Sequence, residues 1–169
     1  MSPGEVRETI EWCAGCGLTV PGGTAGCQEI MDEVLARDFS SPAYFRVHRM
    51  MVDTYSLQHP DRYCLSAKSL AAHLTGLCWL LEHGGSRATG SEALRRWLDG
   101  TPQIEKPELP SFRGELTIAL ARAAADPEGY ADAVDRWARS TWASYVTLHP
   151  IARAWVHAAL TVPRRSQPT

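Results

Sequence analysis

The chain has 169 residues, of which 44% are hydrophobic, and this is enough for one domain with a buried core. Its formal net charge is only −2 and its basic residues are scattered, so we do not expect nucleic acid as a partner. The sequence has no run of eighteen apolar residues and does not begin with a basic-then-apolar signal. We therefore expect a cytoplasmic protein without a membrane partner.

The N-terminal part predicts a short helix followed by a cysteine motif. A serine, a proline and an acidic residue in suitable positions predict a helix over 2–12. The motif Cys13-Ala14-Gly15-Cys16-Gly17 follows, and its glycines permit the tight turn that lets two thiolates bind one tetrahedral ion. A glycine-rich loop then leads to Cys27, at the start of a helix predicted over 28–37. The CxxCG motif thus resembles one half of a zinc knuckle, and Cys27 offers a third thiolate nearby, so the cysteine knuckle would span 12–27.

The central part predicts a long helix over 42–58, which begins with a serine–proline pair and ends at Pro60. At 100° per residue, His48, Tyr55 and His59 fall on one stripe of this helix. The two histidines would lie roughly 16 Å apart along a straight helix, so they cannot share one metal ion.

The rest of the chain predicts further helices and no strand. The helical segments are 66–83, 91–99, 111–125, a segment from the Asp126-Pro127 cap to His149, and 151–162, and a proline-bearing link covers 101–110. We predict an all-α fold: a helical bundle of about six helices with an N-terminal zinc-knuckle-like CxxC loop. One domain would span 1–162, with core helices in 42–83 and C-terminal helices in 111–162, followed by a disordered tail over 163–169.

The cysteines predict a zinc site. Cys13, Cys16 and Cys27 would supply three ligands, and the fourth would be His59, with His48 and then His73 as the alternatives. A redox pair formed by Cys13 and Cys16 is a further alternative. The remaining cysteines, Cys64 and Cys78, are interpreted as packing residues.

The histidines also suggest a pocket between helices. His48, Tyr55, His59 and His73 would line it and are the catalytic candidates, with one histidine as general base and Tyr55 as a donor to developing negative charge. His149, beside Trp142 and Tyr145, is a further possible member. Asp53 has two interpretations: a surface ion pair with Arg49, four residues earlier, or a carboxylate that orients an imidazole from a neighbouring helix.

These residues together resemble an uncharacterised bacterial family, domain of unknown function 5946. The resemblance covers residues 12 to about 85 well and rests on the CxxCG motif at Cys13–Gly17, Cys27, Glu33-Val34-Leu35-Ala36-Arg37, Ser41-Pro42-Ala43-Tyr44-Phe45, His48-Arg49, Val52-Asp53, Tyr55, Gln58-His59-Pro60 and His73-Leu74. The chain departs from the pattern in a shorter loop between Cys16 and Cys27, and in Ala14 where such knuckles usually have proline. The resemblance implies no established activity.

We therefore expect a small zinc-binding helical protein in which the metal is structural and the function is to bind a ligand or a protein. The alternatives are a metal- or histidine-dependent enzyme of small-molecule metabolism, such as a biosynthetic enzyme, and a CxxC thiol redox protein. The partner would be a small molecule or a protein, and the protein would be a monomer or a homodimer. No GxGxxG, P-loop, HExxH or GxSxG motif occurs in the sequence, so the commonest cofactor and hydrolase classes are excluded.

Overall fold

The computed structural model describes residues 9–84 and 87–162. Two short strands, β1 (Ile10–Trp12) and β2 (Thr19–Pro21), pair as an antiparallel hairpin. The helices are α1 (Thr24–Asp38), α2 (Pro42–Phe45), α3 (His48–Gln58), α4 (Pro60–Tyr63), α5 (Ala67–Glu82), α6 (Arg87–Asp99), α7 (Ile118–Ala123), α8 (Pro127–Ser144), a 3₁₀ turn (Val146–Leu148) and α9 (His149–Thr161). The predicted all-α bundle is confirmed, although the described part of the chain has nine α-helices and a hairpin that the sequence did not predict.

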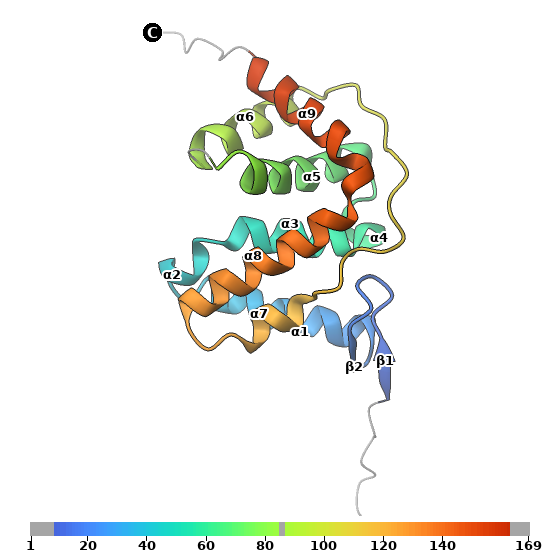
Figure 1. The fold of residues 1–169 in the computed structure, drawn as a ribbon, viewed down its shortest axis with the longest axis vertical. Helices are drawn as coiled ribbons and strands as arrows, with labels where there is room; N and C mark the ends of the chain where they lie inside the picture. Colours follow the sequence, from blue (N-terminus) through green and yellow to red (C-terminus); the bar gives the residue numbers. More distant parts are fainter. Residues whose placement is uncertain (1–8, 85–86, 163–169) are drawn as a thin grey trace, which may run out of the picture.

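Helix α3 lies at the centre of the bundle (Figure 1). It packs against both α5 and α8. The α5 side continues into α6 and α9, which pack on α5 and on each other, whereas α7 packs on α8 and α1. The hairpin lies at the end of the molecule beside α1 (Figure 1). None of the helices in the described ranges is long and apolar enough to cross a membrane.

The second half of α3 is buried around its whole circumference, polar side chains included. Tyr55 and Leu57 pack in the core, and Gln58 is completely buried. Gln58 donates to the carbonyls of Arg113 and Leu116 and accepts a hydrogen bond from the indole of Trp137. These bonds satisfy a buried amide, as burial of a polar group requires, and they fix the C-terminal end of α3.

Two predicted helices differ from the structure near the N-terminus. Within the predicted helix 2–12, Ile10–Trp12 is a strand, and residues 1–8 lie outside the described part of the chain. The predicted long helix 42–58 is two helices, because α2 ends after Phe45 and α3 begins at His48. Val47, between them, has φ −111° and ψ 7°, which is not helical.

The C-terminal predictions also need correction in detail. Of the predicted helix 111–125, only Ile118–Ala123 is helical. Gly114 has φ +103° and its Cα packs against the Ser140 backbone, where a Cβ would come within 3.0 Å, so the chain before α7 follows α8 without forming a helix. The link 101–110 has no helix or strand. The predicted tail 163–169 lies outside the described residues.

Candidate metal centre

The turn between β1 and β2 presents the first two cysteines. The Gly17 amide donates to the Cys13 carbonyl at 2.8 Å, and the Cys13 amide donates to the Leu18 carbonyl at 2.8 Å. Gly17 has φ +75°, a conformation that glycine adopts without steric cost. These bonds turn the chain so that Cys13 is buried and Cys16 is half-buried near it.

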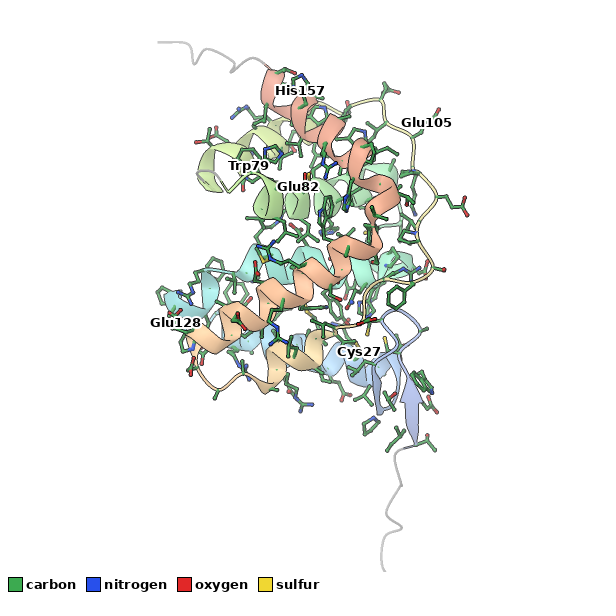
Figure 2. All side chains as sticks on the ribbon, viewed as in Figure 1. Cys27, Trp79, Glu82, Glu105, Glu128 and His157 are labelled. Atoms are coloured by element: carbon green, nitrogen blue, oxygen red, sulfur yellow. The ribbon has the colours of Figure 1, made fainter. Side chains whose placement is uncertain are left out.

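The third cysteine, Cys27, lies in the first turn of α1 and is completely buried. The helix begins immediately after the hairpin, and Gly26 contacts the β2 backbone so closely that a Cβ there would lie 2.0 Å from the Pro21 carbonyl oxygen. Glycine at this position lets the start of α1 approach the hairpin, and this approach brings the Cys27 side chain to the knuckle. Figure 2 shows Cys27 at the hairpin end of the bundle.

His59 lies at the junction of α3 and α4, where Pro60 ends α3 and begins α4. Its Nδ1 donates to the Tyr55 carbonyl at 2.8 Å, and its ring stacks on the Tyr55 ring with centroids 4.0 Å apart. In the neutral imidazole this bond fixes the tautomer, with the lone pair on Nε2. On its other side the ring contacts Gly15, where a Cβ would lie 2.3 Å from His59 Cδ2.

These elements bring four potential ligand atoms together. His59 Nε2 lies 3.3 Å from Cys13 Sγ and 3.5 Å from Cys27 Sγ, and Cys16 Sγ lies 3.7 Å from Cys27 Sγ. All four ligand atoms lie within 4.8 Å of one another, close enough to bind one metal ion. Of the three histidines considered for this place, His59 is the one beside the cysteines.

The protonation of these groups is strongly shifted by their neighbours. Burial lowers the pKa of His59, but hydrogen bonds with Cys13 and Cys16 outweigh this effect and raise it to about 9. Hydrogen bonds from Cys16 and Cys27 lower the pKa of Cys13, whereas hydrogen bonding to Cys13 and Cys16 raises that of Cys27. Burial and the neighbouring Cys27 raise the pKa of Tyr55. The cluster therefore favours at least one thiolate, the form that binds metals.

The other predicted histidines lie elsewhere. His48, at the opposite end of α3, donates from Nδ1 to the buried carboxylate of Asp38 at 2.9 Å, and Tyr130 donates to the same carboxylate. His73, on α5, donates from Nδ1 to Asp53 at 2.9 Å. Neither histidine belongs to the group of potential ligands around the cysteines.

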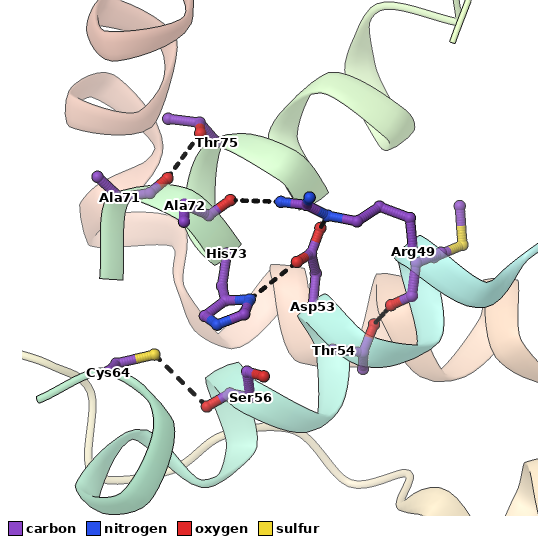
Figure 3. A network of polar contacts seen from close by, with 10 residues as sticks. Arg49, Asp53, Thr54, Ser56, Cys64, Ala71, Ala72, His73 and Thr75 are labelled. Atoms are coloured by element: carbon purple, nitrogen blue, oxygen red, sulfur yellow. Dashed lines mark hydrogen bonds and ion pairs between the residues drawn. The ribbon is translucent and has the colours of Figure 1, made fainter. Parts of the chain in front are cut away.

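Asp53 makes both of the contacts that the sequence suggested as alternatives. It accepts a hydrogen bond from Arg49 Nε at 2.6 Å as well as the one from His73 (Figure 3). The carboxylate is completely buried, so its pair with Arg49 is not a surface ion pair. Asp53 thus orients an imidazole from a neighbouring helix, but at a position away from the cysteines.

The structure does not bring His48, Tyr55, His59 and His73 together at one place. Two of these residues contact the cysteines, and the other two bind separate buried aspartates. A small hollow of about 140 Å³ is lined by Tyr55 and His59 beside the knuckle. His149, a further possible member, instead stacks on Trp142 with ring centroids 4.0 Å apart.

The two remaining cysteines are buried and lie outside the cluster. Burial raises the pKa of Cys64 to about 12 and that of Cys78 to about 12. Cys78, Glu82 and His83 form a second group of potential ligands. However, both Glu82 oxygens already accept from Arg153, at 2.7 and 2.8 Å, so we do not consider this group a candidate metal site.

Two residues near the centre have roles that the sequence does not predict. The side-chain oxygen of Gln28 accepts hydrogen bonds from Tyr55, Arg62 and Tyr63. Gln28 thus connects α1 to α3 and α4 beside Cys27. Gly15 was recognised only as a turn residue, but it also lets the knuckle contact the His59 ring. A glutamine on an amphipathic helix gives no signal for such a role, because its partners are distant in sequence.

Comparison with known families gives one match. The model of a family described as a family of unknown function, DUF5946, matches residues 11–146, a range that includes all four clustered residues. Neither a curated protein nor a solved structure matches the chain significantly.

Proposed function

This chain belongs to the DUF5946 family of unknown function, and we propose that it is a zinc-binding helical protein whose metal has a structural role. One zinc ion would be bound by Cys13, Cys16, Cys27 and His59, and it would hold the hairpin against α1 and the α3–α4 junction. The protein would then act by binding a small molecule or another protein through the helical bundle.

The separations between the ligand atoms support zinc. A tetrahedral ion with Zn–S bonds of about 2.3 Å and a Zn–N bond of about 2.0 Å sets two sulfurs about 3.8 Å apart, and a sulfur and a nitrogen about 3.5 Å apart. The corresponding distances here are 3.7 Å between the sulfurs of Cys16 and Cys27, and 3.3 and 3.5 Å from His59 Nε2 to the sulfurs of Cys13 and Cys27. Three thiolates and one imidazole are also a ligand set typical of structural zinc.

The number and burial of the ligands favour a structural over a catalytic ion. Catalytic zinc keeps a coordination position for water or substrate, whereas four protein ligands close the site. Cys13, Cys27 and His59 are buried, and Cys16 is half-buried. The ring of His59 is further held by the Tyr55 carbonyl, as metal-bound histidines commonly are.

Metal analysis with two matched variants tests this proposal. We expect about one zinc per chain in the purified protein, and Cys13→Ser to lower both the zinc content and the melting temperature. Cys64→Ser is the control, because Cys64 is also a buried thiol, with a 3.6 Å contact to the Ser56 carbonyl, but lies outside the cluster. It should keep the full zinc content. A metal-free protein whose melting temperature is insensitive both to added zinc and to Cys13→Ser would overturn the proposal.

A further inference from the structure

A second site lies in the other half of the molecule, between α5 and α6. A hollow of about 500 Å³ is bounded by these two helices and by Arg49 of α3. Figure 2 shows Trp79, one of its walls, in the upper half of the bundle, well separated from Cys27. The volume falls within the range of small-molecule pockets, and it lies apart from the four clustered ligands.

The hollow follows from the order of side chains along α5. Lys68, Ala72, Gly76 and Leu80 are spaced by four residues, so they form one ridge of the helix, and all four line the hollow. The two central members are small, which lowers the ridge in its middle. Across this gap α6 presents Leu94 and other lining residues. The sequence thus leaves space between two packed helices, with a lysine at one end and apolar side chains at the other.

Two nitrogens of the Arg49 guanidinium hold the side chain at this hollow, and the third nitrogen remains available as a donor. Nε donates to Asp53 at 2.6 Å and Nη2 donates to the Ala72 carbonyl at 2.9 Å (Figure 3). Within the described ranges, Nη1 has no hydrogen-bond partner. A Cβ on Gly76 would lie 2.2 Å from Asp53 Oδ2 and 2.8 Å from Arg49 Nη2, so only glycine leaves room for this pair. Glycine inside a helix is less favourable than alanine, and here it permits a fixed cation.

The unpaired charge that lines the hollow is positive. Lys68 is exposed and, among the residues whose positions are described, has no ion-pair partner. The two acidic residues of the lining are both paired: Glu92 with Arg96 at 2.7 Å, and Asp99 with Arg95 at 3.5 Å. An anion would therefore meet Lys68 and Arg49 as available donors, without an unpaired carboxylate to repel it.

The end of the hollow opposite Lys68 is apolar, and contacts with neighbouring residues hold its tryptophan in place. The Trp79 ring stacks on His83 with centroids 5.0 Å apart. It also packs on α6 at Gly90, where a Cβ would lie 1.9 Å from the ring. Leu80 and Leu94 complete this end. A tryptophan fixed by these two contacts gives the hollow a fixed apolar surface, which suits the hydrocarbon part of a ligand.

We propose that this hollow binds a small organic carboxylate with an apolar body. The carboxylate would accept hydrogen bonds from Arg49 Nη1 and Lys68 Nζ, and the apolar body would lie against Trp79, Leu80 and Leu94. This site does not depend on the proposed zinc, and it would supply the ligand-binding role proposed for the bundle.

Calorimetric titration of the purified full chain with octanoate and 3-phenylpropionate tests the proposal. We expect saturable binding with one site per chain, and octanamide, which has the same apolar body without the charge, to bind at least about tenfold more weakly. Lys68→Met should weaken octanoate binding about tenfold, since a hydrogen bond to a charged group is lost. Lys106→Met is the matched control on a lysine outside the hollow and should leave binding unchanged.

A second variant tests the position of the apolar body. Ala72→Leu adds bulk to the middle of the ridge, at a half-buried position that tolerates a strong helix former, and should abolish binding while the circular dichroism spectrum stays unchanged. The proposal is overturned if neither probe binds, if octanamide binds as well as octanoate, or if Lys68→Met has no more effect than Lys106→Met. These readouts are independent of zinc content, so either proposal can fail while the other stands.

Discussion

Replacing Gly15 with alanine tests whether the knuckle must pack directly on the His59 ring. A Cβ at residue 15 would lie 2.3 Å from His59 Cδ2 and 2.9 Å from the Gln58 carbonyl oxygen. Carbon atoms in contact lie about 3.5–4.0 Å apart, so the ring or the loop must move by about 1 Å. The ring is held by its hydrogen bond to the Tyr55 carbonyl, and the Gly15 carbonyl accepts a hydrogen bond from Arg113 at 3.3 Å. Both sides of the contact therefore resist the movement.

The expected cost follows from this overlap. Overpacking of a well-packed site costs about 1–3 kcal/mol. Because the displacement also separates His59 Nε2 from the sulfurs of Cys13 and Cys27, we expect Gly15→Ala to lower zinc affinity about 10–100-fold, as loss of a group that orients a ligand does. The melting temperature of the zinc-loaded protein should fall by about 2–4 °C for each kcal/mol lost.

Zinc competition with a chromophoric chelator, together with thermal melts, measures both effects. Gly17→Ala is the matched control, since Gly17 lies in the same turn and no atom comes within 4 Å of a Cβ placed there. Its φ of +75° makes alanine there unfavourable by about 1–2 kcal/mol, without a contact to His59. We expect this control to lose stability but to bind zinc more tightly than Gly15→Ala. Zinc binding by Gly15→Ala as tight as that of the wild type would show that the contact between residue 15 and the His59 ring does not matter for the metal.

Three further predictions concern the rest of the bundle. At pH 8, iodoacetamide should label Cys64 at least about 100-fold more slowly in the folded protein than in urea, by peptide mass spectrometry, because burial raises its pKa to about 12. Tyr145→Phe removes the donor to the buried Leu57 carbonyl at 2.6 Å, and should lower the free energy of unfolding by about 1–3 kcal/mol in urea titrations. Hydrogen bonding to Arg153 lowers the pKa of Glu82, so the stabilisation it provides is present above the unfolded pKa of about 4.3 and is lost as the pH falls through the lowered folded value. In thermal melts from pH 7 to 3, Glu82→Gln should therefore be less stable than wild type at neutral pH, and the difference should close at the acidic end.

The sequence predicted the helices that begin with clear capping residues. Ser66 precedes α5, where it forms a capping box with Ser69, and the Asp126 side chain accepts from the Gly129 amide at the start of α8. Such signals are local, because the cap and its partner lie within one turn. The same is true of the cysteine turn, in which the hydrogen bond from Gly17 to Cys13 spans four residues.

The features that the sequence did not predict depend on distant contacts or on elements that are too short. The strands have three residues each, which is too few for an alternating pattern to be distinguished from a helix start. The interruption between α2 and α3, just before His48, contains no proline or glycine from which it could be predicted. The choice between His48 and His59 as the fourth ligand depends on which end of α3 meets the hairpin, and His48 meets Asp38 of α1 instead. Local spacing cannot decide such a choice.

The packing of the hairpin indicates why a metal would be needed at this place. All three residues of β1 are exposed, including Ile10 at 70% and Trp12 at 74%, so this strand buries little apolar surface on the bundle. A two-stranded hairpin alone is at best marginally stable in water. The buried side chains that connect the turn to the helices include the thiols of Cys13 and Cys27 and the imidazole of His59. In the proposed zinc-bound state these same groups bind the metal ion. The free energy of zinc binding then stabilises the packing of the hairpin against the helices.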